Sequence, residues 1–141
     1  MPEGGGNGAK RRIRVVAAAV ERARDGRYLI TRRRPQAVLG GLWEFPGGRV
    51  EEGEDDATAL MREFEHRLGA RVKVGRQLSS VEREYSTYTV ELHLYACEIE
   101  GEHLEARNVA EYRWVRSDEF EQYEFTPVDE ASMNRLLADR E

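Results

Sequence analysis

The sequence predicts an α+β domain in which an amphipathic helix packs on a β-sheet. Two patterns and the chain length carry this prediction. Apolar residues recur at helical spacing between residues 55 and 68, whereas residues 87–98 alternate as a half-buried strand does. The length of 141 residues suits one domain with its own core.

The composition excludes several classes of protein. With 22 Lys and Arg against 27 Asp and Glu, the formal charge is -5, which argues against a nucleic-acid-binding coat. No apolar run reaches the roughly 18 residues that span a bilayer. The single cysteine, Cys97, excludes an intrachain disulfide and suits a reducing compartment. We therefore expect a cytoplasmic protein that binds neither a membrane nor nucleic acid.

The chain begins with a glycine-rich segment that has nothing to pack. We expect residues 1–12 to form a disordered tail and residues 13–141 to form the domain. Basic residues at the end of this tail, Arg11, Arg12 and Arg14, would either be solvated or contact an acidic partner.

Two β-rich runs open the domain, at residues 13–20 and 28–33. Asp25 and Gly26 lie between them and are a good turn signal, so we expect the two runs to pair as a hairpin. A short apolar strand follows at residues 42–45.

A glycine turn ends that short strand. Gly47 and Gly48 follow Pro46, and two adjacent glycines permit positive φ and leave bare backbone that a ligand can approach. The sequence thus predicts an opening the size of a phosphate group at this turn.

The helix is the best-marked element of the chain. An acidic loop at residues 49–54 leads into it, Asp55 suits its N-terminus, and Gly69 is the expected residue after its last turn. We therefore expect a helix over residues 55–68. Four charged or titratable residues lie on the side that faces the glycine turn: Arg62, Glu63, His66 and Arg67.

The second half of the chain predicts more strands and a final helix. Strands are expected at residues 72–74, 77–84, 87–98 and 112–115, a helical turn at 117–120 and a helix at 128–138. In the 87–98 strand, Glu91, His93 and Tyr95 share the polar face. That face would either form a wall for a nucleobase or face solvent.

The spacing around the helix resembles the signature of the Nudix family. Gly48 is followed after five residues by Glu54, and after seven more by Arg62 and Glu63, and the pattern closes at Gly69. The segment LWEFPGG at residues 42–48 also resembles MutT-type nucleoside triphosphate pyrophosphohydrolases. The resemblance extends over residues 13–137 and implies the Nudix fold, a mixed β-sheet sandwiched between α-helices.

The resemblance implies roles for residues of the signature. If the protein is active, Glu63, Glu54 and Arg62 would be the catalytic residues. The metal contacts that remain would be Gly48 and Glu63, and the cofactor would be Mg²⁺ or Mn²⁺.

The chain departs from the family where metals are held. His66 and Arg67 stand where the family has two glutamates, and counting back from Trp114 puts Asn108 where MutT-type members have another carboxylate, with Glu105 or Glu111 as alternatives. Histidine and arginine are poor ligands for Mg²⁺, which prefers oxygen. The site would then have no metal cofactor.

The resemblance also implies a set of nucleotide-binding residues: Arg32, Glu44, Gly47, Gly48, Arg67 and Asp129. Three of them have a second interpretation. Arg32 is either near the nucleotide or a solvated strand end. Arg67 either holds phosphate or pairs with Glu63. Asp129 either binds the base or supplies a charge at the start of the last helix.

Two functions follow. The first is a MutT-like domain with an impaired metal site, which binds a nucleotide, another diphosphate-containing ligand or a protein partner in a regulatory role. The alternative is an active Mg²⁺-dependent pyrophosphohydrolase of the 8-oxo-dGTP diphosphatase type, which cleaves nucleoside triphosphates to monophosphates and pyrophosphate.

Overall fold

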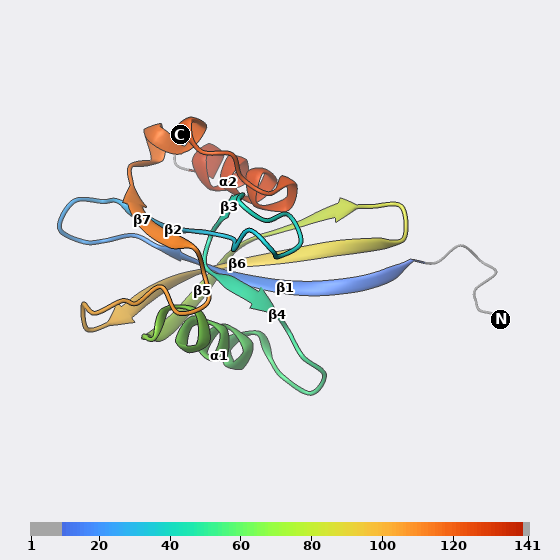
Figure 1. The fold of residues 1–141 in the computed structure, drawn as a ribbon, viewed down its shortest axis with the longest axis horizontal. Coiled ribbons are helices and arrows are strands. Elements are labelled where there is room, and N and C mark those ends of the chain that lie inside the picture. The colour runs from blue at the N-terminus through green and yellow to red at the C-terminus, as the bar shows by residue number, and fades with distance from the viewer. Residues whose placement is uncertain (1–9, 140–141) are drawn as a thin grey trace.

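The computed structural model describes residues 10–139. The strands and helices follow one another along the chain in this order (Figure 1): β1 (Arg11–Val20), β2 (Tyr28–Arg32), β3 (Trp43–Glu44), β4 (Gly47–Arg49), α1 (Asp56–Leu68), β5 (Arg71–Glu84), β6 (Tyr88–Glu100), β7 (Glu111–Val115), a 3₁₀ helix (Ser117–Gln122) and α2 (Pro127–Asp139).

The strands form two sheets. The larger is mixed and has the order β4-β1-β6-β5, with β1 and β6 parallel and the other two pairs antiparallel. The smaller sheet, β3-β2-β7, is antiparallel. The predicted α+β class, with a mixed sheet between helices, is confirmed.

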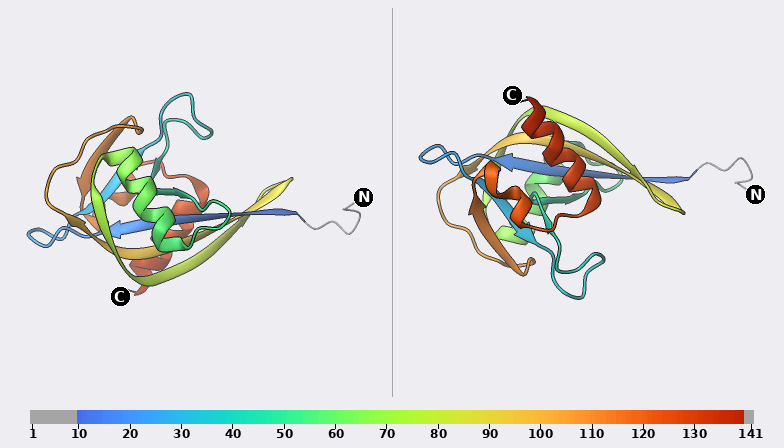
Figure 2. Two further views of the ribbon diagram at one scale, coloured as in Figure 1. Left: turned by 90° about the horizontal axis from the view of Figure 1, so that it is seen from below. Right: turned by 90° about the horizontal axis from the view of Figure 1, so that it is seen from above.

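The two helices cover opposite faces of the larger sheet, as Figure 1 and the two views of Figure 2 show. Two apolar clusters fill the layers. The cluster under α1 includes Leu60 and Phe64 with Val16 of β1, and the cluster under α2 includes Met133 with Leu92 of β6. Alternation along β1 and β6 supplies both clusters, because successive side chains of a strand point to opposite faces.

The expected hairpin of the first two strands is wrong. Strands β1 and β2 lie in different sheets and share a single bridge, Glu21 with Tyr28. The Asp25-Gly26 turn is present, with the Gly26 N–H donating to the Arg22 carbonyl oxygen. Both edges of β1 are already taken, by β4 and by β6, so the chain after the turn enters the smaller sheet.

The expected boundary at residue 13 also shifts. Strand β1 begins at Arg11, which is paired in register with Tyr88 of β6, so residues 11 and 12 belong to the domain and not to a tail. The rest of the predicted tail, residues 1–9, lies outside the described residues. Arg12 is held by ion pairs with Glu82 and Glu91.

Helix α1 begins and ends where the sequence predicts. The Asp55 carboxylate accepts a hydrogen bond from the Thr58 N–H, which satisfies one of the free donors of the first turn. Gly69 has φ 64° and its N–H donates to the Glu65 carbonyl oxygen. Within residues 10–139, no helix is long and apolar enough to cross a membrane.

Candidate functional site

A cavity of about 190 Å³ opens between the two helices, against β1, β3 and β4. Its walls include five of the residues that the sequence assigned to a nucleotide: Glu44, Gly47, Gly48, Arg67 and Asp129. Apolar side chains of β1, Leu92 of β6 and Phe45 complete the lining. A small cavity with an apolar wall and a few converging polar groups is the usual form of a ligand site.

The two glycines are needed for close packing and not for a turn. Neither Gly47 nor Gly48 has positive φ, and both belong to strand β4, which pairs with β1. A Cβ on Gly47 would lie 2.0 Å from the Val16 carbonyl oxygen, and one on Gly48 would lie 2.5 Å from the Glu63 carboxyl group. The predicted glycine turn is therefore a strand, and the Glu63 side chain fills the space where a Gly48 Cβ would lie, while both glycines border the cavity.

Glu63 is buried on α1 and is held by two arginines. Its Oε2 accepts from Arg62 at 2.6 Å, and its Oε1 accepts from Arg67 Nε at 2.7 Å. The ion pair between Arg67 and Glu63 that the spacing predicted is therefore present.

Arg62 also ties the acidic loop to the helix. Its Nε and NH2 donate to the two carboxylate oxygens of Glu54 at 2.8 and 2.9 Å, and NH2 also donates to the Arg49 carbonyl oxygen. These hydrogen bonds lower the pKa of Glu54 to about 2. The same contacts raise the pKa of Arg62. Three residues predicted to be catalytic thus lie together, but each carboxylate is already paired with a guanidinium.

The Arg67 guanidinium lies between two carboxylates. It contacts Glu63 on one side, and its NH1 lies 3.5 Å from Glu44 Oε2 on the other. Glu44 is buried, its Oε1 accepts from Arg33 at 3.1 Å, and its Oε2 has no hydrogen-bond partner. Burial raises the pKa of Glu44, while Arg33 and Arg67 act against that rise.

Charges therefore alternate along the site. The order of contacts is Glu54, Arg62, Glu63, Arg67, Glu44 and Arg33. This series balances its own charge, so the buried carboxylates need no added cation for neutrality.

Asp129 faces the cavity from the first turn of α2. Its Oδ1 accepts from the Phe45 N–H at 3.1 Å and its Oδ2 accepts from the Thr126 hydroxyl at 2.6 Å. Burial, followed by the nearby charge of Glu44, raises the pKa of Asp129 to about 7. Both predicted roles, cavity wall and charge at the helix start, are compatible with this position.

Arg32 lies outside the cavity lining, and its neighbour Arg33 lies within it. Arg32 is exposed at the end of β2, where it donates to the Gly41 carbonyl oxygen and pairs with Glu111. Sequence reasoning chose Arg32 and missed Arg33. The sequence carried no signal that separates the two. The structure does so by register: Arg32 lies opposite Trp43, and successive side chains of a strand point to opposite faces.

Asn108 lies beside His66, which places two of the three substituted positions in contact. Asn108 Nδ2 donates to His66 Nε2 at 2.9 Å, and the Asn108 N–H donates to the Arg67 carbonyl oxygen at 3.2 Å. The two alternatives for this position have other partners: Glu105 pairs with Arg107, and Glu111 pairs with Arg32.

These donors do not fit a divalent cation. Within residues 10–139, no group of three or more His, Cys, Asp or Glu side chains is arranged to hold a metal ion. Gly48 and Glu63, the two metal contacts that the resemblance implied, lie against each other, but both oxygens of that carboxylate already accept from guanidinium groups.

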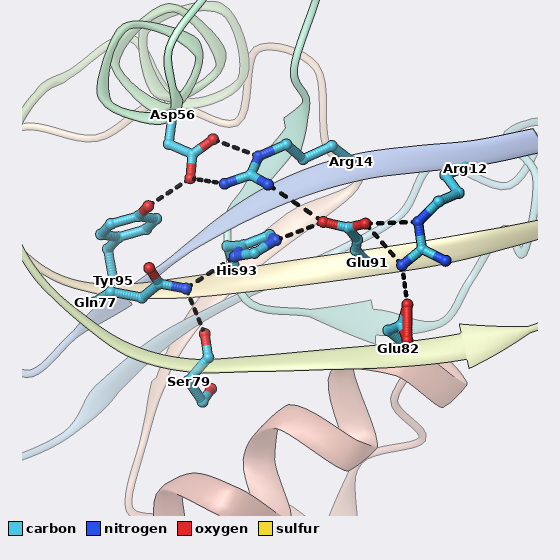
Figure 3. Close-up of polar contacts among 9 residues, drawn as sticks. All are labelled: Arg12, Arg14, Asp56, Gln77, Ser79, Glu82, Glu91, His93 and Tyr95. Atoms are coloured by element: carbon cyan, nitrogen blue, oxygen red, sulfur yellow. Dashed lines mark hydrogen bonds and ion pairs between the residues drawn. The ribbon is translucent and has the colours of Figure 1, made fainter.

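The polar face of β6 is a separate feature, shown in Figure 3. Glu91, His93 and Tyr95 point away from the cavity toward the N-terminal end of α1, where Arg14 pairs with both Glu91 and Asp56. They line no wall of this cavity, so a base bound there would not contact them.

Comparison with known proteins gives a consistent picture. The family model for the NUDIX domain matches residues 17–135. The chain is 37% identical over 128 residues to a CTP pyrophosphohydrolase of Escherichia coli K12, covering 89% of this chain and 92% of that protein. It is 30% identical to an 8-oxo-dGTP diphosphatase of Haemophilus influenzae, covering 90% and 93%.

Solved structures show the same architecture. The solution structure of the E. coli ORF135 protein aligns with a TM-score of 0.82 at 36% identity, over 96% of each chain. A MutT protein from Methanosarcina mazei Go1 aligns with a TM-score of 0.79 at 22% identity, over 93% of this chain and 95% of that one, and indicates the fold alone.

Proposed function

Because this chain belongs to the Nudix family, we propose that it binds a nucleotide, or another ligand that contains a diphosphate, in the cavity lined by Glu44, Arg67 and Asp129. Binding occurs without a divalent cation and without efficient hydrolysis, and the role is regulatory. A protein partner that responds to the ligand, and a cytoplasmic location, belong to the same proposal.

One observation carries the proposal: the Arg67 guanidinium lies between the carboxylates of Glu63 and Glu44. A divalent cation placed beside it would lie a few Å from a like charge, and the repulsion would cost several kcal/mol. The carboxylates would also have to leave their present guanidinium partners. Arg67 thus supplies positive charge to the cavity from within the chain.

The carboxyl groups of Glu44 and Asp129 suit the edge of a nucleobase. Glu44 Oε2 is a buried acceptor with no hydrogen bond, and Asp129 presents a carboxyl group whose pKa of about 7 allows it to donate or accept near neutral pH. The edges of guanine and cytosine carry N–H donors and ring acceptors that match such a pair. A ligand N–H on Glu44 would also satisfy an acceptor whose burial is otherwise costly.

An active pyrophosphohydrolase remains the second candidate. It is favoured by the close grouping of Glu54, Arg62 and Glu63 and by the names of the relatives. It requires Mg²⁺ or Mn²⁺, which Gly48 and Glu63 would have to hold after Arg67 moves away. When several groups act as a unit, losing one of them can cost nearly as much rate as losing all of them, which counts against efficient turnover.

Two measurements separate these functions. The first is pyrophosphate release from a nucleotide panel that includes CTP and 8-oxo-dGTP, with Mg²⁺ or Mn²⁺, and with Glu63→Gln as the control. We expect no turnover above background. Release that disappears in the Glu63→Gln variant would make the chain an enzyme and overturn the proposal.

The second measurement is the melting temperature with the same panel in EDTA. We expect at least one nucleotide to raise it without a metal, and Arg67→Glu to remove the shift. Arg67→Lys keeps the charge and should retain part of it. An unchanged melting temperature across the whole panel would exclude nucleotide binding and leave a protein-binding domain.

A further inference from the structure

A second polar cluster, made of Arg34, Asn108 and His66, lies beside the cavity. Arg34 NH1 donates to Asn108 Oδ1 at 3.0 Å, and Asn108 Nδ2 donates to His66 Nε2 at 2.9 Å. The three residues come from the β2–β3 loop, the segment between β6 and β7, and the last turn of α1. Figure 2 shows these three segments on one side of the molecule.

The cluster and the cavity share two pieces of backbone. Arg33 lines the cavity and Arg34 belongs to the cluster, while Arg67 lines the cavity and His66 belongs to the cluster. A ligand with its base in the cavity therefore has the cluster as an adjacent surface for its remaining groups.

Arg34 differs in its partner from Arg32, Arg33 and Arg67. Arg32, Arg33 and Arg67 each pair with a glutamate, whereas in residues 10–139 the contact of Arg34 is with the neutral Asn108 amide. No carboxylate of the described residues therefore neutralises its charge. The Nε and NH2 groups of Arg34 stay free to donate, in the planar fork that suits phosphate oxygens.

His66 adds a third donor. Because Asn108 Nδ2 donates to Nε2, the neutral imidazole carries its proton on Nδ1, which is then free to donate to an anion. Helix C-termini ordinarily disfavour anions. Here the last carbonyls of α1 already accept backbone hydrogen bonds, since the Arg107 N–H donates to the Arg67 oxygen and the Glu105 N–H to the Leu68 oxygen.

We infer that Arg34, Asn108 and His66 form a metal-independent anion site that holds the phosphate tail of the ligand bound in the cavity. The inference rests on the proposed function, since it assigns the phosphate end of the same ligand. The alternative is a purely structural role, in which the three side chains only connect two loops to α1.

The Asn108→Asp substitution separates the two roles. Aspartate has nearly the same shape and still accepts from Arg34, now as an ion pair. It cannot donate to His66, but it accepts from that imidazole once the proton lies on Nε2, so the connection between loop and helix is retained. It also puts a negative charge in the centre of the cluster. We expect the Asn108→Asp variant to melt at the same temperature as the wild type. Its affinity for tripolyphosphate should be at least tenfold weaker, a difference of about 1.4 kcal/mol in binding free energy.

The experiment is calorimetric titration in EDTA with tripolyphosphate, a nucleoside and the matching nucleoside triphosphate. Arg34→Gln should weaken the binding of both phosphate-containing probes about tenfold and leave the affinity for the nucleoside unchanged. The control is Arg71→Gln, which makes the same change at an exposed arginine of β5 that belongs neither to the cluster nor to the cavity lining, and this variant should bind all probes as the wild type does.

The outcomes are distinguishable. If the triphosphate binds and neither Arg34→Gln nor Asn108→Asp weakens it, the anion site is wrong while the proposed function stands. If tripolyphosphate binds through Arg34 but no nucleoside or nucleotide binds, the anion site stands and the proposed function is wrong. If no probe binds to the wild type, both are wrong.

Discussion

At the scale of single residues, the decisive feature is a guanidinium among buried carboxylates. A buried ion pair has little net stabilising value, but removing one partner leaves the other charge unpaired. Glu63 and Glu44 are both buried and both contact Arg67, which therefore compensates both carboxylates together with Arg62 on Glu63 and Arg33 on Glu44.

Arg67→Gln is therefore predicted to destabilise the fold. Because the Arg67 side chain is 21% exposed, solvent moderates the loss to roughly 1–3 kcal/mol, below that of a fully buried pair. Urea unfolding measures it, with Arg71→Gln as the matched surface control. An equal free energy of unfolding in the two variants would mean that Arg67 leaves no charge unpaired.

Asp129 predicts a pH dependence. Its pKa rises from an ordinary value of 3.8 to about 7 in the folded protein, so the folded state binds more protons than the unfolded state between those values. The stabilisation is complete below pH 3.8 and is lost as the pH rises through about 7.

Asp129→Asn should remove this dependence. Asparagine can still accept from the Phe45 N–H, but it does not ionise. Across the range from pH 4 to 8, the free energy of unfolding of the wild type should fall relative to that of the variant. Parallel curves for the two proteins would show that the Asp129 carboxyl is not perturbed.

At the scale of elements, α1 is attached to the sheet by a hydrogen-bonded chain of polar residues (Figure 3). Arg14 of β1 donates to both oxygens of Asp56 at 2.8 and 2.7 Å, and the Tyr95 hydroxyl donates to the same carboxylate. Arg14 also pairs with Glu91, to which His93 is hydrogen-bonded. The chain holds the start of the helix against β1 and β6.

A double-mutant cycle tests this attachment. Arg14→Met and Asp56→Asn should each destabilise, and the pair should show a coupling free energy of roughly 0.5–1.5 kcal/mol, since the contact is bidentate but Arg14 is 44% exposed. Thermal or urea unfolding of the four proteins measures it. Strict additivity would contradict the contact.

At the scale of the whole molecule, the fold and the site are separable. The predicted impairment concerns residues 66, 67 and 108, while the glycine, arginine and glutamate positions that build the α1 region are kept. Changing ligand residues at the end of a helix leaves its buried face and both caps untouched. The architecture can therefore persist whether or not a metal is held.

The matching prediction concerns a variant in which the three family carboxylates are restored. His66→Glu, Arg67→Glu and Asn108→Glu combined should recover measurable pyrophosphate release that depends on Mg²⁺, because three oxygen donors would then converge near Glu63. The controls are the unmodified chain and the restored chain with Glu63→Gln. Failure of a folded triple variant to release pyrophosphate would show that more than the ligands has changed.

The sequence by itself determined the helix with its caps, the α+β class and the family, because these depend on local spacing and on residues within one segment. Tertiary structure decided which residues meet. Pairing of β1 with β4 and β6 excluded the hairpin, and strand register put Arg33 rather than Arg32 in the cavity. Contact between Arg67 and Glu44 joins α1 to β3, and no local pattern encodes a contact between such distant segments.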